Sequence, residues 1–186
     1  MAQAAVTALA ICLALPIGYK HAENRQPKEA HEVSADSYGV YSAVLSQRHS
    51  SWFKSGRPVR IAALTSAMPS GFRTNDCRAR VGQNKSDVQL LNNLIAANTV
   101  RQRIEQKLSL PGAIVLIRGK TQVETGSVPG IVFLSAIGFS PDRRHAMVYI
   151  TNYCGPLCAS GSLWKLDKVG SSWKVASDDP ICGFIS

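Results

Sequence analysis

The order of apolar and polar positions divides the chain into an apolar N-terminal stretch, a helical part and a part with a period of two. From Asp36, apolar residues recur at spacings of three, four and seven, which predicts an amphipathic helix that fades near His49. Residues 59–68 have the β-branched content of a strand and lie between two prolines. The pattern therefore predicts one helix and one strand before residue 70.

The middle of the chain predicts a loop followed by a second helix. Residues 70–85 are rich in Gly, Asn, Arg and Asp, which favours a loop. The run Ser-Asp-Val-Gln at 86–89 has the form of a capping box, so we predict a helix from there to about residue 98. A further helical turn is expected over 100–108, stopped by a proline.

After residue 113 the apolar period changes to two, which is typical of β-strands. Short joins rich in turn-forming residues separate the strands, and such joins favour antiparallel pairing. The sequence therefore predicts an α+β fold, with N-terminal helices packed on one face of an antiparallel β-meander of four to five strands. The predicted strands are residues 113–118, 131–139, 145–153, 162–167 and 173–177. Aromatic residues on adjacent strands are expected in the core rather than around a pocket: Tyr149, Tyr153, Trp164 and Trp173.

The apolar N-terminal stretch, residues 4–18, is shorter than the run of about 20 residues that a membrane-spanning helix needs. Polar residues follow it at once, which is the pattern of a secretory signal. We predict a signal peptide over 1–22, a flexible leader over 23–34 and a single α+β domain over 35–186. No Lys or Arg precedes the stretch, so a retained membrane anchor stays open as the alternative. The expected location is periplasmic or secreted.

Four cysteines follow this stretch, and an even number in an oxidising compartment favours disulfides. Four cysteines permit three connectivities. We favour Cys154 with Cys158, which a turn would bring together, and Cys77 with Cys182, which would tie the C-terminal tail to the middle of the chain. A redox pair and a zinc site remain alternatives, although the spacing is C-x-x-x-C and only one close pair exists.

The run Cys-Gly-Pro-Leu-Cys at 154–158, together with the strands before it and the Ser-Trp-Lys-Val segment at 172–175, resembles a known group. The group is a widespread family of uncharacterised exported bacterial proteins with a Cys-Gly-x-Leu-Cys hairpin and a Gly-x-Trp-Lys-type final hairpin. Residues 38–45 are also similar to the opening helix of that family. Ala159 stands where several members have glycine. The resemblance implies an exported α+β protein and carries no activity.

The net charge of +9 is unevenly distributed. One acid and eight basic residues lie between positions 48 and 85, and a field of this sign favours anionic partners. We therefore predict a patch for an anionic envelope component or another exported protein, rather than for nucleic acid; a solvated basic face is the alternative. The patch residues are Arg48, Lys54, Arg57, Arg60, Arg73, Arg78, Arg80 and Lys85.

Motifs for hydrolysis, nucleotide binding or zinc catalysis do not occur in the sequence, and its four histidines are scattered. We predict no catalytic, cofactor-binding or metal-binding residues and a non-catalytic binding or interaction protein. One alternative is a secreted inhibitor or accessory protein of an envelope enzyme. The other is an enzyme with an unrecognised hydrolytic site, which would gather His49 or His145 with carboxylates and a nucleophile.

Overall fold

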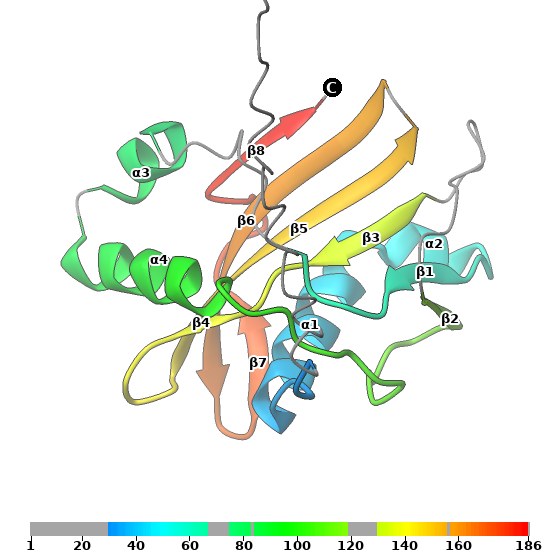
Figure 1. Cartoon of the computed structure of the whole chain (residues 1–186), viewed down its shortest axis with the longest axis horizontal. Helices are drawn as coiled ribbons and strands as arrows, with labels where there is room; N and C mark the ends of the chain where they lie inside the picture. Colours follow the sequence, from blue (N-terminus) through cyan, green and yellow to red (C-terminus); the bar gives the residue numbers. More distant parts are fainter. Residues whose placement is uncertain (1–29, 67–74, 83, 119–129, 156, 186) are drawn as a thin grey trace, which may run out of the picture.

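The computed structural model describes residues 30–66, 75–82, 84–118, 130–155 and 157–185. These residues form four helices and one sheet of eight strands, shown in Figure 1. The predicted signal peptide and most of the leader lie outside the described residues. The helices are α1 (Ala35–Arg48), α2 (Ser50–Lys54), α3 (Asn75–Val81) and α4 (Lys85–Ala97). The strands are β1 (Val59–Ala62), β2 (Ile114–Ile117), β3 (Ile131–Leu134), β4 (Gly138–Phe139), β5 (His145–Gly155), β6 (Cys158–Val169), β7 (Ser172–Val175) and β8 (Cys182–Ile185).

The sheet is mixed and runs in the order β2-β1-β3-β5-β6-β7, while β4 pairs with β5 and β8 pairs with β6. β1 is parallel to both β2 and β3, and the other pairs are antiparallel. The α+β class is confirmed. The predicted antiparallel meander of four to five strands is too small, because β1 joins the sheet by parallel pairing and short strands extend it.

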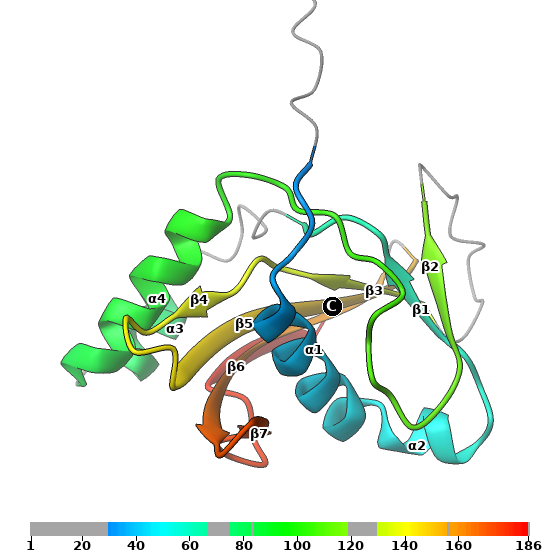
Figure 2. The same ribbon diagram turned by 90° about the horizontal axis from the view of Figure 1, so that it is seen from below.

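Helices cover both faces of the sheet, so the prediction of helices on one face is wrong. In β5, Ala146, Val148 and Ile150 belong to a buried cluster shared with α1. The alternate residues Met147 and Tyr149 belong to a second cluster with α3 and α4. Figure 2 shows α1 and α4 on opposite sides of β5. A strand buried on both faces has an unbroken apolar run, and residues 146–150 of this chain have one.

Helix α1 confirms the first predicted helix, and it starts after Ser34, whose side chain accepts a hydrogen bond from the Ser37 backbone N–H. The helix packs on β7, where a Cβ added at Gly39 would lie 2.7 Å from the Trp173 ring. Trp173 is buried, as are Tyr149 and Trp164, so the prediction of a core role is confirmed for these three aromatics.

The middle of the chain differs from the prediction in three places. Helix α3 lies within the predicted loop, where its Cys77 and Val81 side chains are buried in the second cluster. Helix α4 begins after Asn84, whose side chain accepts from the Ser86 backbone N–H at 3.0 Å, so the predicted capping box is not the cap. Residues 100–108 form no helix, because backbone hydrogen bonds tie them instead to the segment after β1.

The later strands lie close to the predicted ranges, with one division and one omission. The predicted strand 131–139 is divided into β3 and β4 by three non-strand residues. In β4, a Cβ on Gly138 would lie 2.6 Å from the Leu90 carbonyl oxygen, so only glycine lets α4 approach this closely. Strand β8 was not predicted and pairs with β6 at the C-terminal end of the chain.

Two disulfides join the four cysteines that follow the apolar stretch. Cys77 in α3 pairs with Cys182 in β8 across a sequence separation of 105. Cys154 and Cys158 are bonded at the turn between β5 and β6, where Gly155 has a φ of 145°. This is the connectivity favoured from the sequence.

Candidate functional site

Seven of the eight predicted patch residues lie in the described part of the chain, and the structure does not bring these seven together on one surface. Lys54 and Arg57 are exposed at the end of α2, and Arg60 is half-buried in β1. Three more patch residues are exposed on two other helices: Arg78 and Arg80 on α3, and Lys85 at the start of α4. In Figure 1, α2 and α3 lie at opposite ends of the molecule. Arg73 lies outside the described residues.

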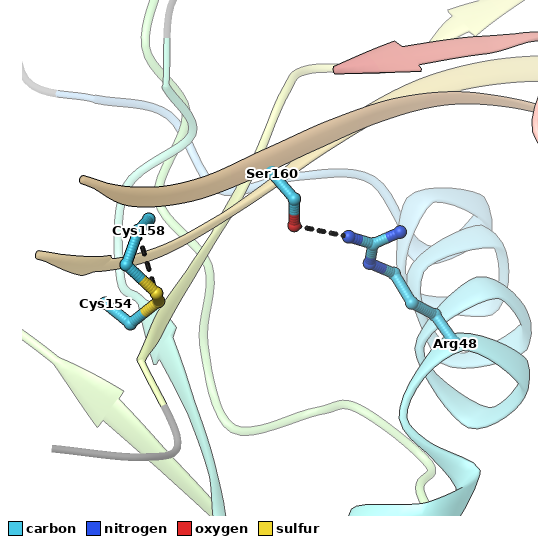
Figure 3. Close-up of a disulfide and its surroundings, with 4 residues drawn as sticks. All are labelled: Arg48, Cys154, Cys158 and Ser160. Atoms are coloured by element: carbon cyan, nitrogen blue, oxygen red, sulfur yellow. Dashed lines mark hydrogen bonds between the residues drawn. A yellow bond between two sulfur atoms is a disulfide. The ribbon is translucent and has the colours of Figure 1, made fainter. Parts of the chain in front are cut away.

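Arg48, the eighth of these residues, is mostly buried against β6. Its Nη1 donates to Ser162 Oγ at 2.8 Å and its Nη2 donates to Ser160 Oγ at 3.1 Å. Figure 3 shows the side chain reaching from α1 toward Ser160, on the strand that starts at the Cys154–Cys158 disulfide. Burial lowers the pKa of the guanidinium, and the charge of Tyr149 acts in the opposite direction. Arg48 makes no ion pair with the described carboxylates.

A largely apolar pocket of about 490 Å³ lies where β1, β2 and β3 end. Parallel strands bring their carboxyl ends to one edge of a sheet, and ligand sites of α/β proteins commonly lie at such an edge. The volume lies within the usual range for small-molecule sites. The residues that line it are Ala62, Ala63, Leu64, Thr65, Ser66, Arg101, Arg103, Ile117, Arg118 and Phe133. We call it the strand-end pocket.

Backbone hydrogen bonds hold the walls of the strand-end pocket in place. The Ala63 N–H donates to the Ile117 carbonyl at 2.9 Å, and the Ala63 carbonyl accepts from Ile104 at 2.8 Å. Thr65 is bonded to Gln102 twice, once through its backbone N–H and once through its side-chain oxygen. The segment after β1 is thus fixed between β2 and the chain that follows α4, so the pocket is largely pre-formed.

Three arginines stand around the strand-end pocket, and all three are exposed. Arg103 lies 3.4 Å from a carboxylate oxygen of Glu105. Arg101 and Arg118 make no ion pair with any described residue. The pocket therefore combines an apolar wall with a positive rim. Sequence reasoning missed these arginines, because they lie outside the basic stretch and no motif links Arg101 and Arg103 to Arg118.

A His–Asp pair lies at the start of β5, beside a smaller pocket. His145 Nδ1 lies 2.7 Å from Asp167 Oδ1, and His145 lines this pocket with Ser86 and Ser140. Both serine hydroxyls donate elsewhere, to Asn84 and to Asp142. No hydrogen bond joins the imidazole to a described hydroxyl, and hydrolysis by a triad requires one. The pair therefore gives no support to the hydrolytic alternative.

His49, the other histidine considered for catalysis, is buried at the end of α1. Its ring stacks near Trp52, with 4.5 Å between ring centroids, and its Nε2 has no described partner. Burial, together with the charge of Arg48 as the smaller cause, lowers the pKa of His49 to about 4. The ring is therefore neutral at physiological pH and belongs to the packing of the helix end.

Among the residues that the structure describes, no group of three or more His, Cys, Asp or Glu side chains is arranged to hold a metal ion. None of the described helices has the length and apolar composition needed to span a bilayer.

Comparisons with family models, with curated proteins and with solved structures found no match to this chain. The resemblance of the Cys-Gly-Pro-Leu-Cys hairpin to exported bacterial proteins therefore stays a prediction.

Proposed function

We propose that this chain is an exported, non-catalytic binding protein whose strand-end pocket holds an anionic amphiphile of the bacterial envelope. The observation that carries the proposal is an apolar cavity with three arginines at its rim, of which only Arg103 is paired with a described carboxylate, that of Glu105. Apolar walls favour an acyl or aromatic body, and guanidinium groups favour a carboxylate or phosphate head. The function proposed from the sequence is kept, and its site moves from the basic stretch to this pocket.

Export is part of the proposal. Two disulfides are consistent with a periplasmic or extracellular location, because such bonds are rare in reducing compartments. The resemblance stated from the hairpin motif points in the same direction. Recovery of the oxidised protein from the periplasm or medium of its bacterial source would support this part. Recovery only from the cytoplasm, with all four thiols free, would contradict it.

The binding test compares three probes by isothermal titration calorimetry. Decanoate has an apolar chain and a negative head, decan-1-ol has the same chain without charge, and acetate has the head alone. We expect decanoate to bind most tightly, because only decanoate uses both the apolar wall and the arginine rim. Salt should weaken the binding of decanoate, since exposed charges are screened over about 8–10 Å at moderate ionic strength.

The matched variants separate the rim from general charge. Arg101→Gln and Arg118→Gln each remove an arginine of the strand-end pocket that makes no described ion pair. Each should weaken decanoate binding several-fold, while Arg78→Gln, which removes an exposed arginine of α3, should leave it unchanged. Failure of decanoate to bind saturably, or equal affinity for decanoate and decan-1-ol in all variants, would overturn the proposal.

A further inference from the structure

The Arg48 side chain lies beside a second cavity, separate from the strand-end pocket and sharing no residue with it. This cavity has a volume of about 520 Å³ and lies between the end of α1 and strands β6 and β8. Its lining residues are Arg48, Ser160, Gly161, Ser162, Pro180, Gly183, Phe184 and Ile185. We call it the Arg48 cavity.

The polar groups that line the Arg48 cavity have more hydrogen-bond donors than hydrogen-bond acceptors. Ser162 Oγ accepts from Arg48 Nη1 and from the Trp164 indole N–H, both at 2.8 Å. A hydroxyl oxygen has two lone pairs, so the Ser162 hydroxyl can make a further bond only by donating its proton. Ser160 Oγ also accepts from the guanidinium. Neither hydroxyl proton has an acceptor among the described residues.

The charge of Arg48 is also left without a counterion in the described part of the chain. Asp178 accepts a hydrogen bond from Gln47, the residue before Arg48, and no hydrogen bond from Arg48 itself. A mostly buried cation without a counterion loses hydration that no opposite charge replaces. The guanidinium has only neutral serine oxygens as described acceptors, and it lines an open cavity. A negatively charged oxygen in that cavity would supply the missing charge.

The rest of the Arg48 cavity is apolar. Phe184 and Ile185 are 40% and 91% exposed, and they lie on the cavity wall with Pro180. Two glycines, Gly161 and Gly183, complete the wall without side-chain polarity. Large apolar residues exposed beside a cation favour a ligand that has both an oxyanion and a small apolar group.

From this arrangement we infer that the Arg48 cavity is a recognition site for a carboxylate or phosphate oxyanion carried on a small apolar group. The guanidinium and the two serine hydroxyls bind the oxyanion, and Phe184, Ile185 and Pro180 contact the apolar group. The inference does not rest on the strand-end pocket, which is formed by other strands.

The test uses the whole protein and three probes: phenylacetate, inorganic phosphate and benzyl alcohol. Phenylacetate has both features, phosphate has the oxyanion alone, and benzyl alcohol has the apolar ring alone. We expect saturable binding of phenylacetate, weaker binding of phosphate and none of benzyl alcohol by calorimetry. Phosphate binding equal to that of phenylacetate would identify a free inorganic anion as the ligand and overturn the apolar part of the inference.

Variants assign the binding to Arg48. Arg48→Met should reduce phenylacetate affinity by about tenfold or more, the loss expected when a charge-assisted hydrogen bond is removed. The strand-end pocket also favours a carboxylate on an apolar body, so the two arginines without an ion pair at its rim are first replaced, in Arg101→Gln/Arg118→Gln. Arg48→Met is added to that variant, and the phenylacetate binding that it removes belongs to the Arg48 cavity. Arg78→Gln, which removes an exposed arginine that lines neither pocket, should leave phenylacetate binding unchanged. Undiminished binding in Arg48→Met would overturn the inference.

The melting temperature of Arg48→Met supplies a second measurement. It distinguishes a ligand-binding arginine from one that only stabilises the fold. Without a bound anion, replacing an uncompensated cation by an apolar side chain should leave the melting temperature unchanged or raise it. Phenylacetate should raise the melting temperature of Arg101→Gln/Arg118→Gln, and adding Arg48→Met to that variant should remove the rise. A large fall in the melting temperature of Arg48→Met, together with no binding by the native protein, would mean that Arg48 only holds the helix against β6.

Discussion

Removal of the two disulfides one at a time should destabilise the protein by different amounts. The Cys77–Cys182 bond closes a loop with a sequence separation of 105, and the Cys154–Cys158 bond closes one with a separation of 4. By the chain-entropy relation the long loop contributes about 5 kcal/mol to the free energy of unfolding, and the short loop contributes about 2 kcal/mol. Burial adds to the difference, because Cys77 and Cys182 lie in the core while Cys158 is exposed.

The assay compares the double variants Cys77→Ala/Cys182→Ala and Cys154→Ala/Cys158→Ala, which leave no new free thiol. A difference of about 3 kcal/mol corresponds to roughly 6–12 °C in melting temperature for a domain of this size. Thermal unfolding followed by circular dichroism measures it, and non-reducing peptide mapping verifies that each variant keeps its remaining bond. Equal shifts, or a larger fall for the short loop, would refute the reasoning.

Three other changes test the packing. Because the pKa of His49 is lowered to about 4 in the folded protein, the unfolded state binds more protons than the folded state between pH 6.5 and 4. The free energy of unfolding should therefore fall by about 3 kcal/mol as pH falls through that window. The fall should be smaller in His49→Phe, and urea unfolding at each pH measures it. Gly138→Ala should destabilise the protein by about 1–3 kcal/mol, because the added Cβ would lie 2.7 Å from the Leu94 Cα; an unchanged urea midpoint would contradict this contact. Tyr41→Phe should cost about 1–3 kcal/mol, because the buried Tyr41 hydroxyl donates to the Ser135 carbonyl at 2.7 Å; a neutral result in the same assay would indicate that water replaces the hydroxyl.

The sequence predicted those helices and strands whose apolar periodicity and boundary residues both indicate the same element. Helix α1 and the hairpin of β5 and β6 lie close to the predicted ranges, because their patterns are long and their boundaries contain turn-forming residues. The unbroken apolar run at 146–150 indicates that β5 is buried on both faces, whereas a period of two predicts burial on one face only.

The missed elements depend on contacts between distant parts of the chain. Helix α3 has a loop-like composition and is held through Cys77 to β8, an element of four residues that follows a proline-containing turn. The strand-end pocket forms only because β1 pairs in parallel with β2, about fifty residues later, and this pairing has no local signal. Its arginines could therefore not be assigned to one site from the sequence.

The spacing of the cysteines along the chain also predicts the order in which the two disulfides form. Biosynthesis proceeds from the N-terminus, so Cys77 is made before either thiol of the β5–β6 turn and long before Cys182. The cost of closing a loop grows with its length, so Cys154 and Cys158 should find each other first. Once Cys154 and Cys158 are bonded, neither can form a non-native disulfide with Cys77, which stays reduced until Cys182 in β8 is available. The Cys154–Cys158 bond should thus reduce non-native disulfide pairing during folding, although it contributes less than the Cys77–Cys182 bond to the free energy of unfolding.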